Sequence, residues 1–209
     1  MTKLTANQKQ LLERLFDIGA ICFGAFKVKH HEQFPDAPLT PFYINFRLLR
    51  SDHLAMKYAL KECYRLTQNL TFDYIADIPT AITPLAAIWS YEKKIPLITC
   101  RPPKKHGLRV SLDGIYEPGK TALLIDDLIT QGTSKIEPVA RLREAGLTVH
   151  DLAVIIDREQ GGVDTMKKVD VTLHAALPIT QVFAYYRRTE RISAQTYQEV
   201  RDYLALPTE

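Results

Sequence analysis

Two adjacent carboxylates stand where a short apolar segment ends. Asp126 and Asp127 directly follow the apolar residues 122–125, which are typical of a buried strand. Backbone pairing stops at the end of a strand, so polar side chains there can face a ligand without being buried. Carboxylates in such a place suit contacts with hydroxyl groups or with a metal ion.

The acidic pair is followed by a loop that suits a phosphate. The loop supplies two threonines, a serine, an amide and a glycine: Thr130, Gln131, Gly132, Thr133 and Ser134. Hydroxyls, close backbone approach at the glycine and the free amides of a helix start together favour a bound phosphate. We expect Pro138 in the first turn of that helix, where its missing donor costs little. One ligand with a diol and a phosphate would use both halves of the segment.

Two other interpretations of this segment are possible from its residues alone. A solvated acidic turn followed by a capped helix would produce the same pattern. A Walker B strand would also carry the acidic pair, but it needs a GxxxxGK[ST] loop, which the chain lacks. A GxGxxG motif is absent too, which disfavours a dinucleotide site.

The segment Leu123–Ser134 resembles the signature of the type I phosphoribosyltransferases: an apolar strand, two acidic residues and a TxGxS-type loop. The resemblance implies that Asp126 and Asp127 hold the ribose hydroxyls of phosphoribosyl pyrophosphate. It also implies that the loop from Thr130 to Ser134 holds the 5′-phosphate of that donor.

Three more segments resemble the orotate phosphoribosyltransferases within this group. Phe23–Lys29 resembles the family's FGxFxLK segment and places Lys29 at the lysine that binds substrate. Pro41–Asn45 resembles the SPxYID strand, whose aromatic residues would be Phe42 and Tyr43. Ile156–Gly162 resembles LDREQGG, with Arg158 at the position that contacts orotate. Orotate is a planar anion, and an arginine fork and aromatic faces suit it. From the residues alone, Arg158 could instead pair with Glu159 or Asp157, Lys29 could be a solvated charge, and the two aromatics could be core residues.

A fourth segment, Ile78–Ala86, resembles the loop that binds the pyrophosphate leaving group through backbone donors. It places Thr80 and Ala81 at this loop, where some family members have a lysine or a tyrosine. An ordinary turn from a strand into a helix would have the same pattern.

A basic segment, Arg101–Arg109, is too charged for a core and is flanked by proline and glycine, which predicts a surface loop. Near an anion site such a loop can close over pyrophosphate and offset its developing charge. In the family the loop reads RKxxKxHG and enters the active site of the other subunit of a dimer, which implies a homodimer. Lys104 would be the catalytic lysine, with His106, Arg101 and Lys105 beside it. Pro102-Pro103 leaves one basic residue fewer, so weaker catalysis, altered substrate choice and a solvated loop without function stay open.

The implied reaction transfers the ribosyl 5-phosphate group to orotate through an oxocarbenium-like transition state and releases pyrophosphate. Positioning and charge neutralisation would carry most of the catalysis. Mg²⁺ is expected mainly on the substrate's own oxygens, with no protein metal site. The candidate catalytic residues are Lys104, His106, Arg101, Lys105 and Asp127.

Alternating elements must position these residues. A helix is expected from Thr5 to about Ala20, then two short strands, and from residue 51 onward strands that alternate with helices. The expected elements include a helix after Asp52, a helix near Thr83 to Lys93, a strand at Val169–Leu173 and helical stretches that begin near Pro178 and Ser193. Alternation of this kind predicts an α/β domain with a doubly wound, mainly parallel sheet. We expect a single domain over 1–209, with a small N-terminal hood lobe over about 1–50 that includes C-terminal contributions, and a core over about 51–180. Residues just after Ala76, Thr99, Ile125 and Ile156 should then lie at the ligand-binding edge.

Composition narrows the class of protein. The 209 residues are 46% hydrophobic with a net charge of +3, which suits a globular protein and is too small a charge to imply nucleic-acid binding. Three cysteines show no paired or metal-binding spacing, and no segment is apolar enough for a signal peptide or a membrane span, so we expect the cytoplasm. A phosphoribosyltransferase for another base, and a regulator that senses phosphoribosyl pyrophosphate without catalysis, are the alternatives.

Overall fold

The computed structural model describes residues 3–27, 32, 35–101 and 112–206. In this part of the chain, six strands form one sheet in the order β5-β4-β3-β6-β7-β8. Their bounds are Tyr74–Asp77 for β3, Leu97–Cys100 for β4, Leu112–Asp113 for β5, Ala122–Ile129 for β6, Asp151–Asp157 for β7 and Thr172–Pro178 for β8. All neighbours are parallel except β4 and β5, which confirms the mainly parallel sheet.

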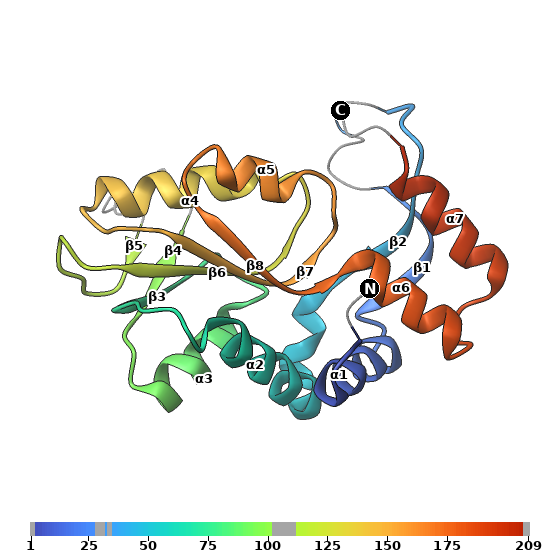
Figure 1. The fold of residues 1–209 in the computed structure, drawn as a ribbon, viewed down its shortest axis with the longest axis horizontal. Helices are drawn as coiled ribbons and strands as arrows, with labels where there is room; N and C mark the ends of the chain where they lie inside the picture. Colours follow the sequence, from blue (N-terminus) through green and yellow to red (C-terminus); the bar gives the residue numbers. More distant parts are fainter. Residues whose placement is uncertain (1–2, 28–31, 33–34, 102–111, 207–209) are drawn as a thin grey trace.

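Helices cover both faces of the sheet (Figure 1). The first group, on one face, is α1 (Ala6–Asp17), α2 (His53–Thr67) and α3 (Thr83–Lys93); the second, on the other, is α4 (Thr133–Glu144) and α5 (Gly162–Lys167). Side chains of β6 alternate between the two cores, since Leu123 and Ile125 pack in one cluster and Leu124 packs in the other. The sheet is therefore buried on both faces, as a doubly wound fold requires.

A second, two-stranded sheet lies beside the main one (Figure 1). It pairs β1 (Ile21–Phe26) with β2 (Thr40–Ile44) in antiparallel register, and a 3₁₀ helix, η2 (Phe46–Ser51), follows. The C-terminal helices α6 (Ile179–Arg188) and α7 (Ala194–Leu204) pack against it through ring contacts of Phe42. The N-terminal lobe with C-terminal contributions thus has a structural counterpart, while its boundary near residue 50 stays a prediction.

Helix starts follow local capping chemistry. Thr5 and Gln8 form a reciprocal capping box at α1, and Asp52 accepts the amide of Ala55 at α2. Ser193 accepts the amide of Thr196 at α7. These short-range signals explain why the predicted helix starts agree with the structure.

The strand before the acidic pair is longer than predicted. It was expected to end at Ile125, but β6 continues to Ile129 because β7 still pairs with it, Leu128 opposite Ile156 and Ile129 opposite Asp157. Pairing with β3 on the other side does stop at Ile125. The acidic pair thus lies beyond the last residue of β6 that pairs with β3, in the part of β6 that still pairs with β7.

Two further expectations were wrong. Pro138 lies inside α4 and not in its first turn, because the helix begins at Thr133. The strand expected at Val169–Leu173 begins only at Thr172, because the amides of Val169 and Val171 both bond to the carbonyl of Met166 and complete the turn after α5. The short strand β5 was not predicted, since two residues carry no periodic signal.

Candidate active site

The acidic pair, Asp126 and Asp127, lies at the carboxyl edge of the sheet, where ligands bind in open α/β folds. On the adjoining strand, Asp77 closes β3, so a third acidic residue lies at this edge. Asp127 is half-buried, whereas Asp77 and Asp126 are buried. Of the three, Asp127 is the one with exposed surface for a ligand.

Asp126 forms a buried ion pair with Lys135 of α4. The relative exposure of the two residues is only 5% and 7%. Burial raises the pKa of Asp126 to about 7, while the ammonium of Lys135 lowers it and the neighbouring Asp127 raises it. Asp126 also accepts the amide of Asp127 at 2.8 Å, and one oxygen of Asp127 accepts the amide of Leu128 at 2.9 Å. The two carboxylates therefore have different surroundings, which the sequence did not reveal.

The loop between β6 and α4 has the geometry expected of a phosphate cradle. Gly132 precedes α4 in the left-handed region with φ 81°, which glycine adopts at little cost. Thr133 and Ser134 are exposed at the start of the helix, and no side chain caps its first amides in the described part of the chain. Two exposed hydroxyl-bearing residues thus lie at a helix start without a side-chain cap, while Thr130 and Gln131 are half-buried.

The loop rests on Gly162 at the start of α5. A Cβ at Gly162 would lie 2.7 Å from Cγ1 of Ile129 and 2.9 Å from the carbonyl oxygen of Thr130. The amide of Arg158 also donates to the carbonyl of Ile129 at 2.9 Å. The segment from Arg158 to Gly162, predicted only to contact orotate, therefore also supports the loop at residues 130–134.

Asp77 organises the loop expected to meet pyrophosphate. Its carboxylate accepts the hydroxyl of Thr99 at 2.5 Å and that of Thr83, and burial raises its pKa. Within the loop, the Pro79–Thr80 peptide bond is cis, and the carbonyl of Thr80 accepts from Arg50 at 3.0 Å. Thr80 is exposed and Ala81 is half-buried. The sequence pointed to the edge after Ala76 but did not single out Asp77.

Arg158 lies against the aromatic residues of β2. Its Cζ is 4.7 Å from the ring centroid of Phe42, which is only 1% exposed. The neighbouring Glu159 accepts the amide and hydroxyl of Thr180 at 2.9 and 2.6 Å, and Asp157 accepts the amide of Glu159 at 2.8 Å. The structure thus contains neither of the ion pairs weighed for Arg158 from the sequence.

The two aromatics of β2 have different roles in packing. Phe42 is a core residue, with Phe183 at a centroid distance of 4.8 Å, whereas Tyr43 is 36% exposed and lies 5.8 Å from the ring of Phe26. Successive strand residues point to opposite faces, which explains the difference. Lys29 lies outside the described residues.

The first residue of the basic segment, Arg101, lies beside the β4–β5 pair. Arg101 follows β4 and pairs with Asp113 of β5, with 2.6 Å from one terminal nitrogen to a carboxylate oxygen. Its carbonyl accepts from Arg141 of α4. Lys104, Lys105 and His106 lie outside the described residues. The structure therefore gives Arg101 a structural partner and leaves the other loop residues as predictions.

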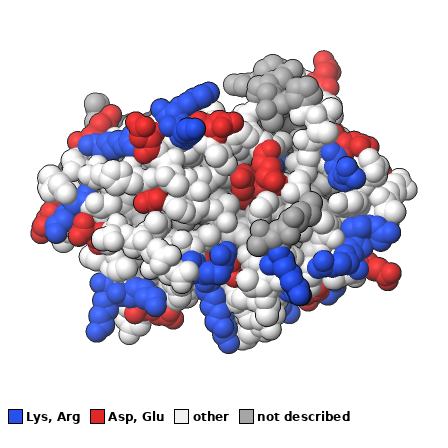
Figure 2. Space-filling model, in the orientation of Figure 1, with Lys and Arg blue, Asp and Glu red and all other residues white. Residues whose placement is uncertain are grey.

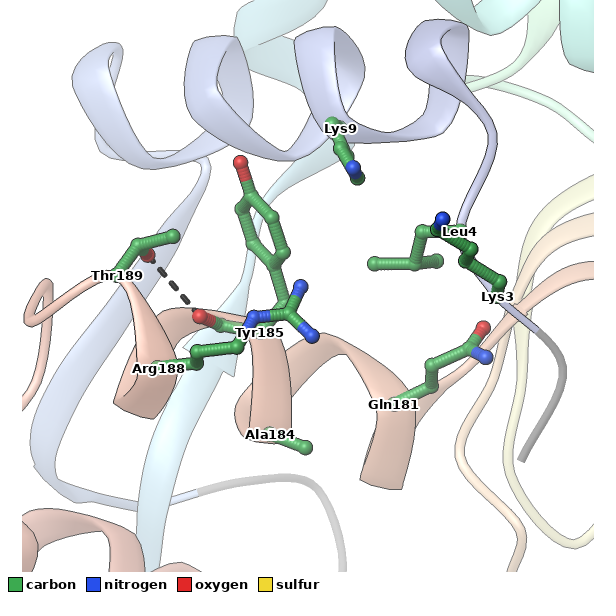
Figure 3. A pocket seen from close by; sticks show the side chains of 8 residues that line it. All are labelled: Lys3, Leu4, Lys9, Gln181, Ala184, Tyr185, Arg188 and Thr189. Carbon is green, nitrogen blue, oxygen red and sulfur yellow. Dashed lines mark hydrogen bonds between the residues drawn. The ribbon is translucent and has the colours of Figure 1, made fainter.

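A pocket of about 550 Å³ lies elsewhere, between α6 and the N-terminal segment (Figure 3). Lys3, Lys9 and Arg188 bring positive charge to it, and no residue expected in the site lines it. Acidic and basic side chains are interspersed over the coloured surface in Figure 2, without a patch of one sign across that face.

No family model matches the chain. Over 197 residues, 93% of the chain, it is 29% identical to uridine 5′-monophosphate synthase of Bos taurus, of which it spans 40%. Over 197 residues, again 93% of the chain, it is 27% identical to orotate phosphoribosyltransferase of Pyrobaculum aerophilum, of which it spans 98%. The solved structure of Leishmania donovani UMP synthase matches with a TM-score of 0.84 at 29% identity, over 96% of this chain and 42% of that one.

Over 80–96% of its length, the chain is 26–28% identical to several proteins named orotate phosphoribosyltransferase. It spans less than half of the bovine relative and nearly all of the archaeal orotate phosphoribosyltransferase. The α/β fold with a six-stranded, mainly parallel sheet and a small N-terminal sheet is the fold of type I phosphoribosyltransferases.

The described residues contain no cluster of three or more His, Cys, Asp or Glu side chains that could hold a metal ion. Asp127 is a half-buried carboxylate next to the phosphate loop. These residues fit Mg²⁺ that is carried mainly by the substrate's oxygens, with Asp127 beside it. No helix in the described ranges has the length and apolar character needed to cross a membrane.

Proposed function

We propose that the protein is an orotate phosphoribosyltransferase: it transfers the ribosyl 5-phosphate group from phosphoribosyl pyrophosphate to orotate and makes orotidine 5′-phosphate and pyrophosphate. The observation that carries this proposal is the arrangement at one sheet edge of the acidic pair, the phosphate loop and Arg158. Relatives named orotate phosphoribosyltransferase, matched over most of the chain, support it. The reaction belongs to the synthesis of UMP, and the proposed compartment is the cytoplasm, where the free thiols of Cys22, Cys63 and Cys100 would stay reduced.

On the donor side, Asp127 would accept hydrogen bonds from the ribose hydroxyls, with Asp126 next to it on β6. Residues 130–134 would hold the 5′-phosphate through the hydroxyls and amides at the start of α4. The loop after β3, with Thr80 and Ala81, would meet the pyrophosphate group through its backbone, since Asp77 ties both flanking hydroxyls to the sheet. Together these contacts fix the donor before the bond to pyrophosphate breaks.

On the acceptor side, Arg158 would bind the carboxylate of orotate, and Lys29 would bind a ring oxygen. Tyr43 is the more exposed of the two aromatic residues, whereas the buried ring of Phe42 lies against the guanidinium of Arg158. Orotate is already an anion, so the protein needs to position it rather than to remove a proton. These residues would thereby favour a planar acceptor with a negative charge.

Charge on the leaving group would be offset by Lys104 and His106, with Arg101 and Lys105 at the edge of the loop. Bound Mg²⁺ would supply further positive charge to the pyrophosphate oxygens. We propose a homodimer in which the basic loop of one subunit reaches the site of the other. The loop leaves the sheet at the β4–β5 edge, where Arg101 pairs with Asp113.

A direct assay tests the proposal. Pyrophosphate release would be measured with phosphoribosyl pyrophosphate and Mg²⁺, with orotate, uracil, adenine and hypoxanthine as separate acceptors. Turnover with orotate, and weak or no turnover with the others, is expected. Activity only with a purine would contradict the choice of acceptor. Tight donor binding by calorimetry without turnover on any base would instead favour a sensing role.

A further inference from the structure

A pocket outside the candidate active site lies between α6 and the start of α1 (Figure 3). We propose that this pocket binds a nucleoside diphosphate, with the phosphates at its three cations and the base against its apolar wall. Its volume of about 550 Å³ lies within the usual range of small-molecule sites. The proposal goes beyond the proposed function, since no residue assigned to orotate or to phosphoribosyl pyrophosphate is among those that line the pocket.

Three cations line the pocket. Lys3 precedes α1, Lys9 lies in the first turn of α1, and Arg188 is the last residue of α6. Figure 3 shows Lys9 and Arg188 turned toward the space between the two helices. The described residues that line the pocket include no acid, and none of the three cations forms an ion pair with another described residue. Like charges gathered in one place repel each other, so a bound anion would be stabilised here.

An acidic side chain close to the pocket already has partners. Glu13 lies one turn after Lys9 on α1, and its carboxylate accepts the hydroxyl of Tyr185 at 2.7 Å and Nε of Arg191 at 3.0 Å. Arg191 is thus neutralised within the protein, whereas Arg188, three residues earlier, has no carboxylate partner in the described ranges. The positive charge at the pocket is therefore available to a ligand.

Part of the lining is apolar. Leu4 and Tyr185 are only 8% and 7% exposed, and Ala184 is half-buried. The guanidinium of Arg188 lies over the ring of Tyr185, 5.5 Å from its centroid, so a planar donor fork borders the apolar wall. Such forks bind phosphate oxygens through paired hydrogen bonds. A molecule with a phosphate end and a flat apolar end matches this combination.

The charge of the lining favours a diphosphate over a monophosphate. A terminal phosphate carries about −1.5 to −2 charges near pH 7, and the other phosphate of a diphosphate adds about one more. Their sum nearly balances the charges of Lys3, Lys9 and Arg188, whereas a monophosphate leaves part of the repulsion in place. We therefore expect ADP and UDP to bind more tightly than AMP.

Calorimetric titration of the full-length protein with ADP and with UDP tests the site, with AMP and inorganic pyrophosphate as comparison ligands. Lys9→Gln with Arg188→Gln removes two of the cations and should raise the Kd for ADP at least about tenfold, the size expected when charge-assisted hydrogen bonds are lost. The matched control is Lys57→Gln with Arg187→Gln, which removes the same charge from α2 and α6 at positions that do not line the pocket. It should leave the Kd within about twofold.

A single variant separates binding from folding. Arg188 is exposed, so Arg188→Gln alone should keep the thermal unfolding midpoint of the wild type and still weaken ADP about three- to tenfold. A ligand that binds only the folded protein raises this midpoint. ADP should therefore raise it in the wild type and in the control by more than in the double variant.

Several results would overturn the inference. One is no binding of ADP or UDP at millimolar concentrations, and another is a Kd for ADP equal to that for AMP or inorganic pyrophosphate. Equal weakening in the control would attribute the effect to overall charge. Binding to vesicles that contain phosphatidylserine, lost in the double variant and without any ADP binding, would assign this surface to a membrane. Turnover is a separate readout: a protein that binds ADP here but does not use orotate contradicts only the proposed function.

Discussion

Lys135 and Asp126 form an ion pair inside the protein, between the first helix after the phosphate loop and the strand before it. Each is less than a tenth exposed. A pair of this kind gains little in net stability, because both charges lose water, but either charge left alone is strongly unfavourable. The ion pair therefore constrains the position of α4 relative to β6, on either side of the loop at residues 130–134.

Replacing Lys135 by methionine should destabilise the protein by about 3–5 kcal/mol, because a buried carboxylate then has no partner. The double variant Asp126→Asn with Lys135→Met should recover most of that loss. Urea unfolding of the wild type, the two single variants and the double variant would measure the coupling. Additive losses in the double variant would contradict it.

The same pair predicts a pH dependence. The pKa of Asp126 is raised from 3.8 to about 7, so between these values the folded protein binds a proton that the unfolded chain has released. This group's contribution to the free energy of unfolding is present below about pH 4, falls as the pH rises and is lost above about pH 7. Unfolding curves at several pH values should show a shallower decline for Asp126→Asn than for the wild type. Equal slopes would rule out this titration.

Gly162→Ala should weaken donor binding, because the new methyl group would collide with Ile129 and with the backbone oxygen of Thr130. We expect the KM for phosphoribosyl pyrophosphate to rise about tenfold or more, since small displacements of a positioning loop are costly. The control is Gly161→Ala, where a Cβ meets nothing within 4 Å but φ is 95°. Backbone strain there should cost about 1–2 kcal/mol of stability with a smaller effect on the donor. Equal donor effects would argue against the collision.

Asp77→Ala should weaken the binding of pyrophosphate several-fold, because the hydroxyls of Thr83 and Thr99 lose their acceptor and the loop between them loses its anchor. Product inhibition by pyrophosphate, measured against orotate turnover, would show the change. Asp77→Asn keeps one carbonyl acceptor and should lie between the alanine variant and the wild type. No change in either variant would remove Asp77 from the organisation of this loop.

The basic loop gives a prediction that also tests the dimer. Lys104→Ala or His106→Ala should lower turnover at least about tenfold. If the loop acts across the interface, mixing inactive Lys104→Ala and inactive Asp127→Asn subunits should restore activity, up to about a quarter of the wild type for random pairing of two subunits. Sedimentation would confirm that the variants still pair. Activity that stays at the level of the separate variants would place the loop in its own subunit's site.

Local signals in the sequence predicted much of the fold. The helix at Thr83–Lys93 agrees in both bounds, because its first turn carries a proline and its last residue precedes Lys94 in a left-handed conformation. The extent of β6 could not be predicted, since it depends on how far β7 continues beside it. Contacts between distant segments were the main omission: Tyr203 packs against Phe42, and Asp77 accepts the hydroxyl of Thr99, through the arrangement of whole elements.

The antiparallel pairing of β4 with β5 separates sequence changes in the basic segment from the rest of the fold. The described residues on either side of the basic segment pair at the edge of the sheet, with Cys100 opposite Leu112 and Thr99 opposite Asp113. Insertions, deletions and prolines between these anchors then leave the cores on either side of the sheet intact. Exchange of this segment for that of a relative should therefore yield folded chimaeras, in which the chemistry of the loop varies independently of the scaffold.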